Sequence, residues 1–306
     1  MNDIKKKKNK NHKHDDPNEN KCKKPKLDHP PASNPAVQCL TQLMISKELS
    51  DLTIKMTGHN GNFKVHRLVL AMWSSVFKER LFGPKPVGDT IILGKEGDGP
   101  AHVEAFECFI NYMYTGEAKL TSEKVAAYVY ALAHNYIMNH LKTVCSQYLL
   151  IHLSAGNAPI ILGAATETKD NPLIKRCATL IPESYYSSPK IGSLNNDSLE
   201  QLLKQDAPVS SELVIFQGIL NWGRLHLKKQ KKEISPTTLR QVLEPFLQHV
   251  RFLTMSLEEI VKNVVPEHIL KDDEILSIQQ NIANVPEVSL PSWVSTMRNK
   301  ETLMKE

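Results

Sequence analysis

Cysteine is scarce in this sequence, with five residues among 306. No two of them form a Cys-x-x-Cys pair. They are widely scattered, at positions Cys22, Cys39, Cys108, Cys145 and Cys177. An odd number of scattered cysteines argues against a disulfide framework. The missing pairs also argue against a zinc-binding ring, whose ligands come in closely spaced pairs. We therefore expect reduced thiols that are mostly buried.

Long apolar runs are also absent. The longest unbroken ones fall far short of the roughly 18 residues that are needed to cross a bilayer. The lysine-rich N-terminus is followed by no apolar segment, so it does not have the pattern of a secretory signal. The sequence therefore predicts a soluble, cytoplasmic protein with no membrane partner.

Motifs of the common enzyme classes are missing as well. The sequence contains no Gly-x-Ser-x-Gly, His-Glu-x-x-His, Walker loop or dinucleotide fingerprint. A glycine-rich stretch from Gly94 to Pro100 does not continue into Gly-Lys-Ser/Thr, and we interpret it as a plain loop. We expect no catalytic residue, no cofactor and no metal site. His66 is interpreted as a hydrogen-bonded structural residue at a strand-to-helix junction.

The net charge of +5 is confined to the first 35 residues. These hold ten lysines and five acidic residues, and the rest of the chain carries 28 residues of each sign. A neutral folded part argues against a general nucleic-acid-binding surface. Residues 1–35 have almost no large aliphatic side chains and are predicted to be a disordered Lys-rich tail. Its lysine clusters resemble nuclear import signals or weak contact sites for polyanions. The alternative is that the tail only makes the protein more soluble.

A hairpin followed by a helix is predicted between Ser50 and Gly83. Leu52, Ile54 and Met56 alternate with polar residues, as in a half-buried strand. A glycine-containing turn then leads to a second strand. Apolar residues next recur at helical spacing, which predicts one apolar helix that runs through Phe82. The residues on this spacing are Leu68, Val69, Met72, Trp73, Val76 and Phe77.

This stretch resembles the BTB/POZ domain. The matching residues are Asp51, His66-Arg67-Leu68-Val69-Leu70-Ala71, Ser74-Ser75-x-Phe77 and, further on, Phe109-Ile110-Asn111-Tyr112-Met113-Tyr114-Thr115-Gly116. The resemblance covers residues 36–153. It implies an α+β fold class, in which a BTB/POZ domain consists of a small sheet flanked by helices.

Beyond residue 153 the pattern is entirely helical. Asp197-x-x-Glu200 and Ser256-x-x-Glu259 are predicted capping boxes at helix starts. Residues 154–280 resemble the all-α BACK domain. The matching residues are Asn157-Ala158, Leu162, Leu173, Cys177, Leu199, Leu203, Glu212, Phe216, Leu220-Asn221-Trp222, Val250-Arg251-Phe252 and Met255-Ser256. The combination is most similar to the BTB-BACK-PHR subfamily, but residues 281–306 are expected to be a C-terminal tail without a PHR domain.

The BTB resemblance implies two surfaces for a second subunit. A helix from Ala36 to Glu48 carries an apolar stripe, and in the family a helix here packs against its counterpart in a second copy. The stripe consists of Val37, Leu40, Leu43 and Met44. Asp51 and Arg67 match an acidic and a basic residue in a pocket at the dimer interface. The alternative for this pair is a strand-end cap and a solvated arginine. We therefore expect a homodimer through the BTB domain.

Cullin-3-binding relatives carry a hydrophobic-x-Glu motif a few residues beyond the Phe of Ser-x-x-Phe. By spacing, this motif falls on Lys85, Pro86 and Val87, where the first residue is charged and the third is not glutamate. Phe82 is a neighbouring apolar anchor. The resemblance thus implies a cullin-facing loop with a degenerate motif, and weakened binding to cullin-3.

These observations lead to one expected function and one alternative. The first is a non-enzymatic BTB-BACK protein-interaction adaptor, which serves as a dimeric substrate adaptor or scaffold of a cullin-3 RING ubiquitin ligase and binds an unidentified protein substrate. The alternative is a BTB scaffold or regulator that has lost cullin binding, and that the basic tail directs to the nucleus. Neither involves a membrane, a cofactor or a specific nucleic acid.

Overall fold

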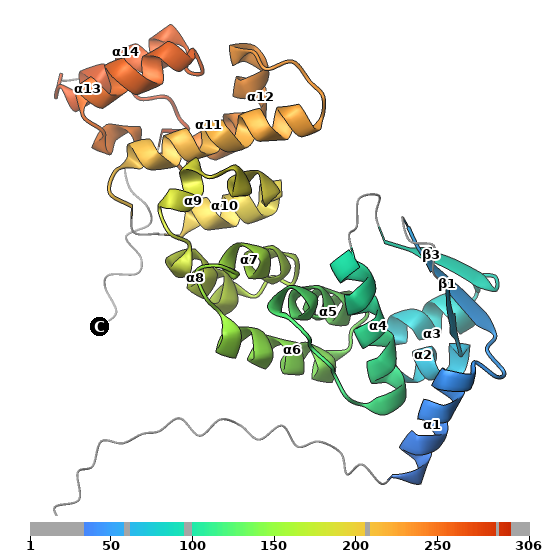
Figure 1. The fold of residues 1–306 in the computed structure, drawn as a ribbon. Coiled ribbons are helices and arrows are strands. Elements are labelled where there is room, and N and C mark those ends of the chain that lie inside the picture. Colours follow the sequence, from blue (N-terminus) through green and yellow to red (C-terminus); the bar gives the residue numbers. More distant parts are fainter. Residues whose placement is uncertain (1–33, 58–61, 95–99, 206–208, 286–287, 295–306) are drawn as a thin grey trace, which may run out of the picture.

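The computed structural model describes residues 34–57, 62–94, 100–205, 209–285 and 288–294. The predicted Lys-rich tail up to residue 33, the predicted turn at residues 58–61 and most of the glycine-rich loop lie outside these ranges. Helices dominate, and a small sheet lies at one end of the molecule (Figure 1).

The first half, which contains the sheet, comprises α1 (Pro35–Ser46), β1 (Leu52–Met56), β2 (Asn62–Val65), α2 (Arg67–Trp73), α3 (Ser75–Phe82), β3 (Thr90–Leu93), α4 (Pro100–Thr115), α5 (Glu123–Asn135) and α6 (Asn139–His152). The second half comprises α7 (Ala158–Glu167), α8 (Asn171–Leu180), α9 (Ser184–Ser187), η1 (Pro189–Ser193), α10 (Asn196–Lys204), α11 (Glu212–Lys229), α12 (Pro236–Leu247), η2 (Phe252–Thr254), α13 (Leu257–Glu259), η3 (Ile260–Val264), η4 (Val265–Glu267) and α14 (Asp272–Ile282).

Three short strands form the sheet, in the order β2-β1-β3. β1 pairs with β2 in antiparallel fashion, with Leu52 opposite Val65, which confirms the predicted hairpin. β3 pairs with β1 in parallel fashion, with Ile54 opposite Ile91. Leu52, Ile54 and Met56 are all buried, so the predicted alternation places one face of β1 on the core.

The single helix predicted after the hairpin is wrong, because the segment forms two helices, α2 and α3. Ser74 lies between them in an extended conformation and both ends α2 and caps α3. Its hydroxyl accepts a hydrogen bond from the backbone N–H of Phe77 at 3.2 Å and donates one to Tyr136 O at 2.7 Å. The break changes which side chains face the core: Phe77 is buried, whereas Leu68 and Met72 are exposed.

Helices α4, α5 and α6 complete the core of the first half. α4 packs against α1, α2 and α5, and its buried side chains include Phe106, Phe109 and Met113. Gly116 follows α4 with a φ of 74°, and its N–H bonds to Tyr112 O at 2.8 Å. Gly116 is therefore the predicted helix stop, since glycine adopts this left-handed conformation without strain. The expected α+β class, a small sheet flanked by helices and followed by further helices, is confirmed.

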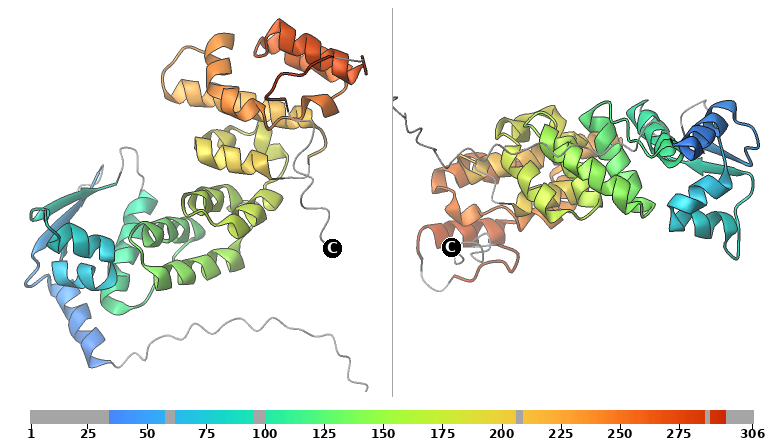
Figure 2. Two further views of the ribbon diagram at one scale, coloured as in Figure 1. Left: turned by 180° about the vertical axis from the view of Figure 1, so that it is seen from behind. Right: turned by 90° about the horizontal axis from the view of Figure 1, so that it is seen from below.

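From α7 onward the helices stack on one another and extend the molecule away from the sheet (Figure 2). α7 contacts α5, α8 and α10, while the long helix α11 contacts α9, η1 and α12. Trp222 of α11 is buried and donates its Nε1–H to Leu194 O at 2.9 Å. One continuous set of buried apolar residues runs through both halves, so the core does not stop where the sheet-containing half ends.

Helix caps agree with the sequence at some helix starts and not at others. Ser256-x-x-Glu259 forms the predicted capping box at the start of α13. The box predicted at Asp197-x-x-Glu200 is wrong, because Asn195 caps α10 instead and accepts a bond from Ser198 N at 2.7 Å. Asp197 lies inside α10, in its first turn, whereas Asn195 has the extended backbone that a cap residue needs.

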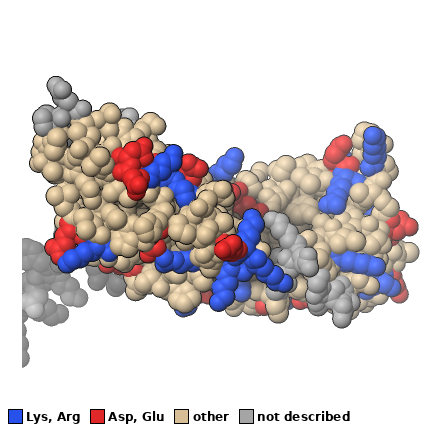
Figure 3. Space-filling model, turned by 90° about the horizontal axis from the view of Figure 1, so that it is seen from above, with Lys and Arg blue, Asp and Glu red and all other residues tan. Residues whose placement is uncertain are grey.

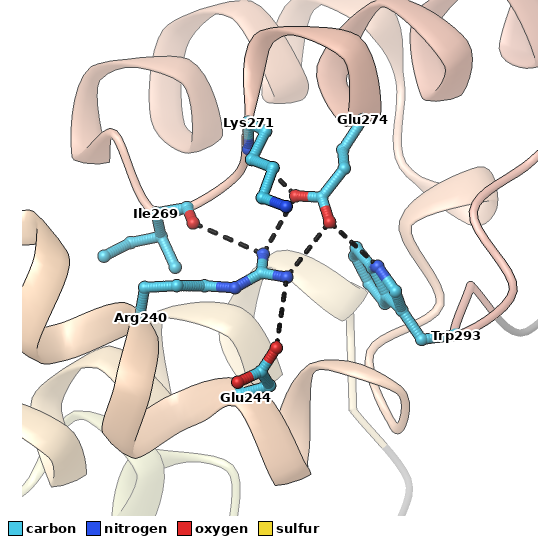
Figure 4. Close-up of polar contacts among 6 residues, drawn as sticks. All are labelled: Arg240, Glu244, Ile269, Lys271, Glu274 and Trp293. Carbon is cyan, nitrogen blue, oxygen red and sulfur yellow. Dashed lines mark hydrogen bonds and ion pairs between the residues drawn. The ribbon is translucent and has the colours of Figure 1, made fainter.

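The last described segment, residues 288–294, folds back onto the C-terminal helices (Figure 4). Trp293 donates its Nε1–H to Glu274 Oε1 at 2.9 Å, and the Arg240 guanidinium lies 5.5 Å from the centre of the indole ring. Arg240 also donates to both oxygens of Glu274, at 2.9 and 3.0 Å. The expected C-terminal tail, residues 281–306, therefore contains a packed segment, and its first two residues belong to α14.

Glu274 should stabilise the fold only while it is ionised. Burial by itself raises the pKa of its carboxyl group, but hydrogen bonds from Lys271 N–H, Arg240 and Trp293 outweigh burial and hold the pKa below its usual value. A folded-state pKa that is lower than the unfolded one gives stability above the unfolded pKa, and this stability is lost as the pH falls through the folded value. Glu274→Gln should lower the free energy of unfolding by about 1–3 kcal/mol near pH 7, and this loss should shrink below about pH 4.

Urea titrations between neutral and acidic pH, followed by tryptophan fluorescence, measure this difference. Glu244→Gln is the matched control, because Glu244 approaches the same arginine only to 3.9 Å and its side chain is largely exposed. The control should change the stability by less than about 1 kcal/mol. A loss in Glu274→Gln that stays constant down to the lowest pH would contradict this account.

Candidate protein-interaction surfaces

Helix α1 packs on α4 of its own chain through part of its apolar stripe. Leu40 and Met44 contact the hydrophobic core. Val37 and Leu43 are half-buried, and no residue of α1 is fully buried. The structure therefore places all four predicted residues on a helix that its own chain covers only partly.

Four exposed apolar side chains lie on the last part of α1, on the segment that follows it and on α2, and together we call them the α1–α2 apolar surface. It consists of Ile45, Leu49, Leu68 and Met72. Leu68 and Met72 are one turn apart and share a face of α2, where Met72 is 72% exposed. Leu49 is almost fully exposed and has a φ of 58°, which costs energy for a leucine. Sequence reasoning missed this surface because it assigned Leu68 and Met72 to the buried face of one helix.

His66 connects the end of α1 to α4. Its Nδ1 lies 2.8 Å from Tyr114 Oη, and its Nε2 lies 2.7 Å from Glu48 O. The backbone N–H of His66 donates to the same tyrosine oxygen at 3.0 Å. The hydroxyl therefore donates its own proton to Nδ1, and Nε2–H donates to Glu48 O. These are contacts of a structural histidine, and they hold the backbone ahead of Leu49 beside the start of α2.

Asp51 and Arg67 are brought together, but through backbone groups. Asp51 Oδ1 accepts the backbone N–H of Arg67 at 2.8 Å, and Arg67 Nε donates to Asp51 O at 3.1 Å. The guanidinium also donates to Val87 O at 3.2 Å and Gly88 O at 2.9 Å, and it pairs with Asp89 at 2.8 Å. The Arg67 side chain is only 14% exposed, so it is not the solvated arginine of the alternative reading. The pair fixes the start of α2 to the loop ahead of β3.

The loop predicted to face a cullin does not present its three motif residues as one exposed unit. Lys85 and Pro86 are exposed. Val87 is half-buried, packs against the core and donates its N–H to Arg80 O at 3.1 Å. Phe82, the last residue of α3, is 57% exposed. The third motif position is therefore turned toward the core in addition to lacking a glutamate.

A cleft of about 780 Å³ lies beside this loop. It is lined by Val76, Arg80 and Lys85 and by Ile137, which comes from the turn between α5 and α6. Ile137 is exposed and has a φ of 56°, so the turn holds an apolar side chain in solvent at a cost in backbone energy. Sequence reasoning missed Ile137, because its position in a helical pattern gave no sign that it lies in a turn.

The buried thiols are not nucleophiles near neutral pH. Burial raises the pKa of Cys108 to about 11 and that of Cys177 to about 12. Burial also raises the pKa of Cys145, whereas Cys39 on α1 is exposed. A protonated thiol is a weak nucleophile and a poor metal ligand. In the described part of the chain, no group of three His, Cys, Asp or Glu residues is placed to hold a metal ion.

Charges of both signs are spread over the surface. In the view from above, Lys and Arg side chains gather near the middle of the molecule, while both of its ends carry Asp and Glu as well (Figure 3). None of the helices within the described ranges has the length and apolar character needed to span a bilayer.

Comparisons with known proteins add the family context. The BTB/POZ domain model matches residues 40–153. BTB/POZ domain-containing protein 6 from Homo sapiens is 29% identical over 84% of this chain and 48% of the relative. The Xenopus tropicalis protein with the same name is 30% identical over 84% of this chain and 49% of the relative. BTB/POZ domain-containing protein 3 from Homo sapiens is 29% identical over 68% of this chain and 40% of the relative. The chain thus spans about half the length, or less, of these relatives.

Proposed function

From the BTB/POZ domain that residues 40–153 form, we propose that this chain is a non-enzymatic protein-interaction adaptor. Within that class we assign it to the dimeric substrate adaptors or scaffolds of cullin-3 RING ubiquitin ligases. The observation that carries the proposal is the α1–α2 apolar surface on a BTB/POZ domain. The matched relatives are BTB/POZ domain-containing proteins, and no catalytic family is indicated by them.

A second copy of the chain would bind at the α1–α2 apolar surface. Leu49 and Met72 are far too exposed to contribute to the core of their own chain. Contiguous exposed apolar patches of several hundred Å² mark interaction sites on soluble proteins, and in this proposal the four side chains belong to such a patch. The partly covered stripe of α1 and the structural contacts of Asp51 and Arg67 fit a support role for this surface, in which the pair holds α2 in place.

Cullin-3 would bind at Phe82 and the cleft that Ile137 borders. Phe82 supplies an exposed aromatic anchor, and Ile137 supplies an exposed apolar side chain that lines the cleft. The loop residues Lys85, Pro86 and Val87 supply neither the apolar nor the glutamate position of the motif. The proposed binding is therefore weaker than that of adaptors that carry a complete motif.

The second half of the chain fits a BACK domain in this proposal. Its helices α7 to α14 stack on the BTB/POZ domain through contacts of α5 with α7. Residues 154–280 would extend the surface that faces the cullin and position the substrate-binding part of the adaptor. We propose a cytoplasmic location, with entry into the nucleus when the lysine-rich first 35 residues are recognised as an import signal.

A specific observation favours the alternative function as well. The inward position of Val87 and the charge of Lys85 both work against cullin binding. A BTB scaffold or regulator that dimerises without binding a cullin is therefore our second candidate. The two candidates differ in one measurable property, which is the affinity of the full chain for the N-terminal domain of cullin-3.

Titration calorimetry of the full chain with this cullin-3 domain should give a measurable affinity that depends on Phe82. Phe82→Ala should weaken the affinity about tenfold or more, because it removes an anchor whose burial contributes about 1.5–3 kcal/mol. Ile92→Ala is the matched control, since Ile92 is 67% exposed on β3 and should not matter. If the titration detects no binding of the full chain to the cullin-3 domain, the cullin assignment is wrong and the scaffold candidate remains.

A further inference from the structure

A groove of about 840 Å³ runs along the junction between the BTB/POZ domain and the helices that follow it. α5 forms one wall, α7 forms the floor, and the segment from residue 182 to residue 198 forms the other wall. The floor carries the small residues Pro159, Gly163 and Ala164 together with the larger side chains of Ile160 and Glu167. The groove is lined by different residues from the cleft beside Phe82 and from the α1–α2 apolar surface, so it is a separate site.

The charges around the groove favour an anionic occupant. Lys124 on α5 and Lys190 on η1 are both exposed, and no carboxylate among the described residues pairs with either ammonium group. Glu167 is the only acidic residue among those that line the groove, and its carboxylate already accepts a bond from Asn135 at 2.7 Å. Two unpaired lysines at the rim attract an acidic partner.

A buried hydroxyl at the groove has no partner. Ser198 is only 1% exposed, and its Oγ makes no hydrogen bond within the described residues. A buried polar group without a partner is rare and needs an explanation. Ser198 and the cap residue Asn195 both line the groove where α10 begins. The positive end of the helix dipole and a free hydroxyl donor thus lie at the same place.

Gly163 gives an independent sign that the groove is kept open. It sits in the middle of α7, where a glycine is less stable than an alanine. A Cβ at this position would meet no atom within 4 Å, so close packing does not require the glycine. Its φ also lies outside the left-handed range. Open space above an otherwise costly glycine is explained by an occupant that lies along the floor of the groove.

We propose that this groove binds an acidic segment of a partner protein. The segment would lie over the small residues of α7, with its carboxylates near Lys124 and Lys190 and with a main-chain or side-chain acceptor at the start of α10. An extended peptide fits the groove, because its main chain can lie close to the small residues Pro159, Gly163 and Ala164 of α7. The site is a candidate for the capture of a client, and it depends neither on dimerisation nor on a cullin.

A pooled library of short peptides, equally rich in acidic, amide and basic residues, tests the site on the immobilised full chain. Retained peptides should be enriched in Asp and Glu by about fivefold or more, and this enrichment should fall with added salt. Gly163→Trp should abolish retention at the groove by filling the floor, whereas Gly163→Ala adds one methyl group over the same floor and should weaken retention only slightly while it raises the melting temperature. Lys124→Gln combined with Lys190→Gln should weaken retention about fivefold or more without affecting folding.

Three outcomes would overturn the proposal. Retention that is equal in the parent chain and in Gly163→Trp means that the peptides bind elsewhere. Enrichment of basic or amide-rich peptides means that the charge assignment is wrong, and no enrichment means that the groove is not a peptide site. The same variants should keep the sedimentation behaviour and the cullin affinity of the parent chain, so a failure here is separable from a failure of the adaptor function.

Discussion

Replacing both Leu68 and Met72 by lysine should convert the proposed dimer to a monomer. Sedimentation velocity over a range of concentrations should show the dissociation constant rise by about 100-fold or more. In a symmetric dimer each residue occurs twice at the interface, so the double variant removes four apolar side chains. Each such side chain contributes about 1.5–3 kcal/mol when it is fully buried.

The added lysines also oppose the interface directly. A charged group that loses its hydration without gaining a partner is costly. The monomer itself should keep its fold, because Leu68 and Met72 lie in solvent in the isolated chain. A melting temperature that matches the parent, together with a lower sedimentation coefficient, is the expected pair of results.

Leu276→Lys is the control for this experiment. Leu276 is also an exposed apolar residue, but it lies on α14 at the opposite end of the molecule from α2 (Figure 1). This variant should sediment as the parent does. If the double variant at Leu68 and Met72 remains a dimer, the second copy does not bind at the α1–α2 apolar surface and the proposed dimer interface is wrong.

Replacing Arg251 by methionine should lower the free energy of unfolding by about 2–4 kcal/mol. Arg251 forms an ion pair with Glu212, the first residue of α11, whose side chain is only 4% exposed. Arg251 Nε donates to Glu212 Oε1 at 2.6 Å, and its backbone N–H donates to Oε2 at 3.2 Å. Methionine keeps much of the apolar part of the arginine side chain but removes the guanidinium group. The buried Glu212 carboxylate then loses the charge of Arg251, and this loss is what makes breaking a buried ion pair costly.

Arg224→Met is the matched control, because it makes the same substitution at an ion pair near the surface. Arg224 pairs with Glu267, and this pair is more exposed, with 45% of the Arg224 side chain and 28% of the Glu267 side chain accessible to solvent. Such pairs contribute about 0–1 kcal/mol. Urea unfolding followed by circular dichroism compares the two variants. If both variants lose the same free energy of unfolding, the burial of Glu212 does not make its ion pair more important for stability than the pair near the surface.

The double variant Glu212→Leu with Arg251→Met separates two explanations for a loss. If the cost comes from an uncompensated buried charge, the double variant should be more stable than Arg251→Met alone. If it is less stable, then the loss reflects packing around α11 and not the charge. Both results are measurable by the same urea titrations.

Local pattern was enough for much of the fold. The alternation of Leu52, Ile54 and Met56 predicted β1, and the glycine at residue 116 predicted the end of α4. The capping box at Ser256-x-x-Glu259 was also predicted, because its two bonds depend on residues only three positions apart. The resemblance to the BTB/POZ domain then supplied the fold class, which the structure confirms.

The sequence was less informative wherever a distant group decides the local structure. The helix break at Ser74 depends on a bond to Tyr136 O, a residue 62 positions away. The cap of α10 was placed wrongly, since Asn195 and Asp197 have similar propensities and only the backbone path selects between them. The candidate contacts of Asp51 and Arg67 were predicted as a pair, but their bonds to Val87 and Gly88 were not.

The sequence by itself determined which residues are apolar and at what spacing, and hence the kinds of element and the family that they resemble. Tertiary structure alone decided which apolar residues stay uncovered: Leu68, Met72 and Ile137 have the same character as buried neighbours such as Leu70 and Phe77. Burial is a property of the contacts between elements, and those contacts join residues that are far apart in the chain. Periodicity records only neighbours within a few turns, so it could not separate the side chains that hold this chain together from those free to bind another.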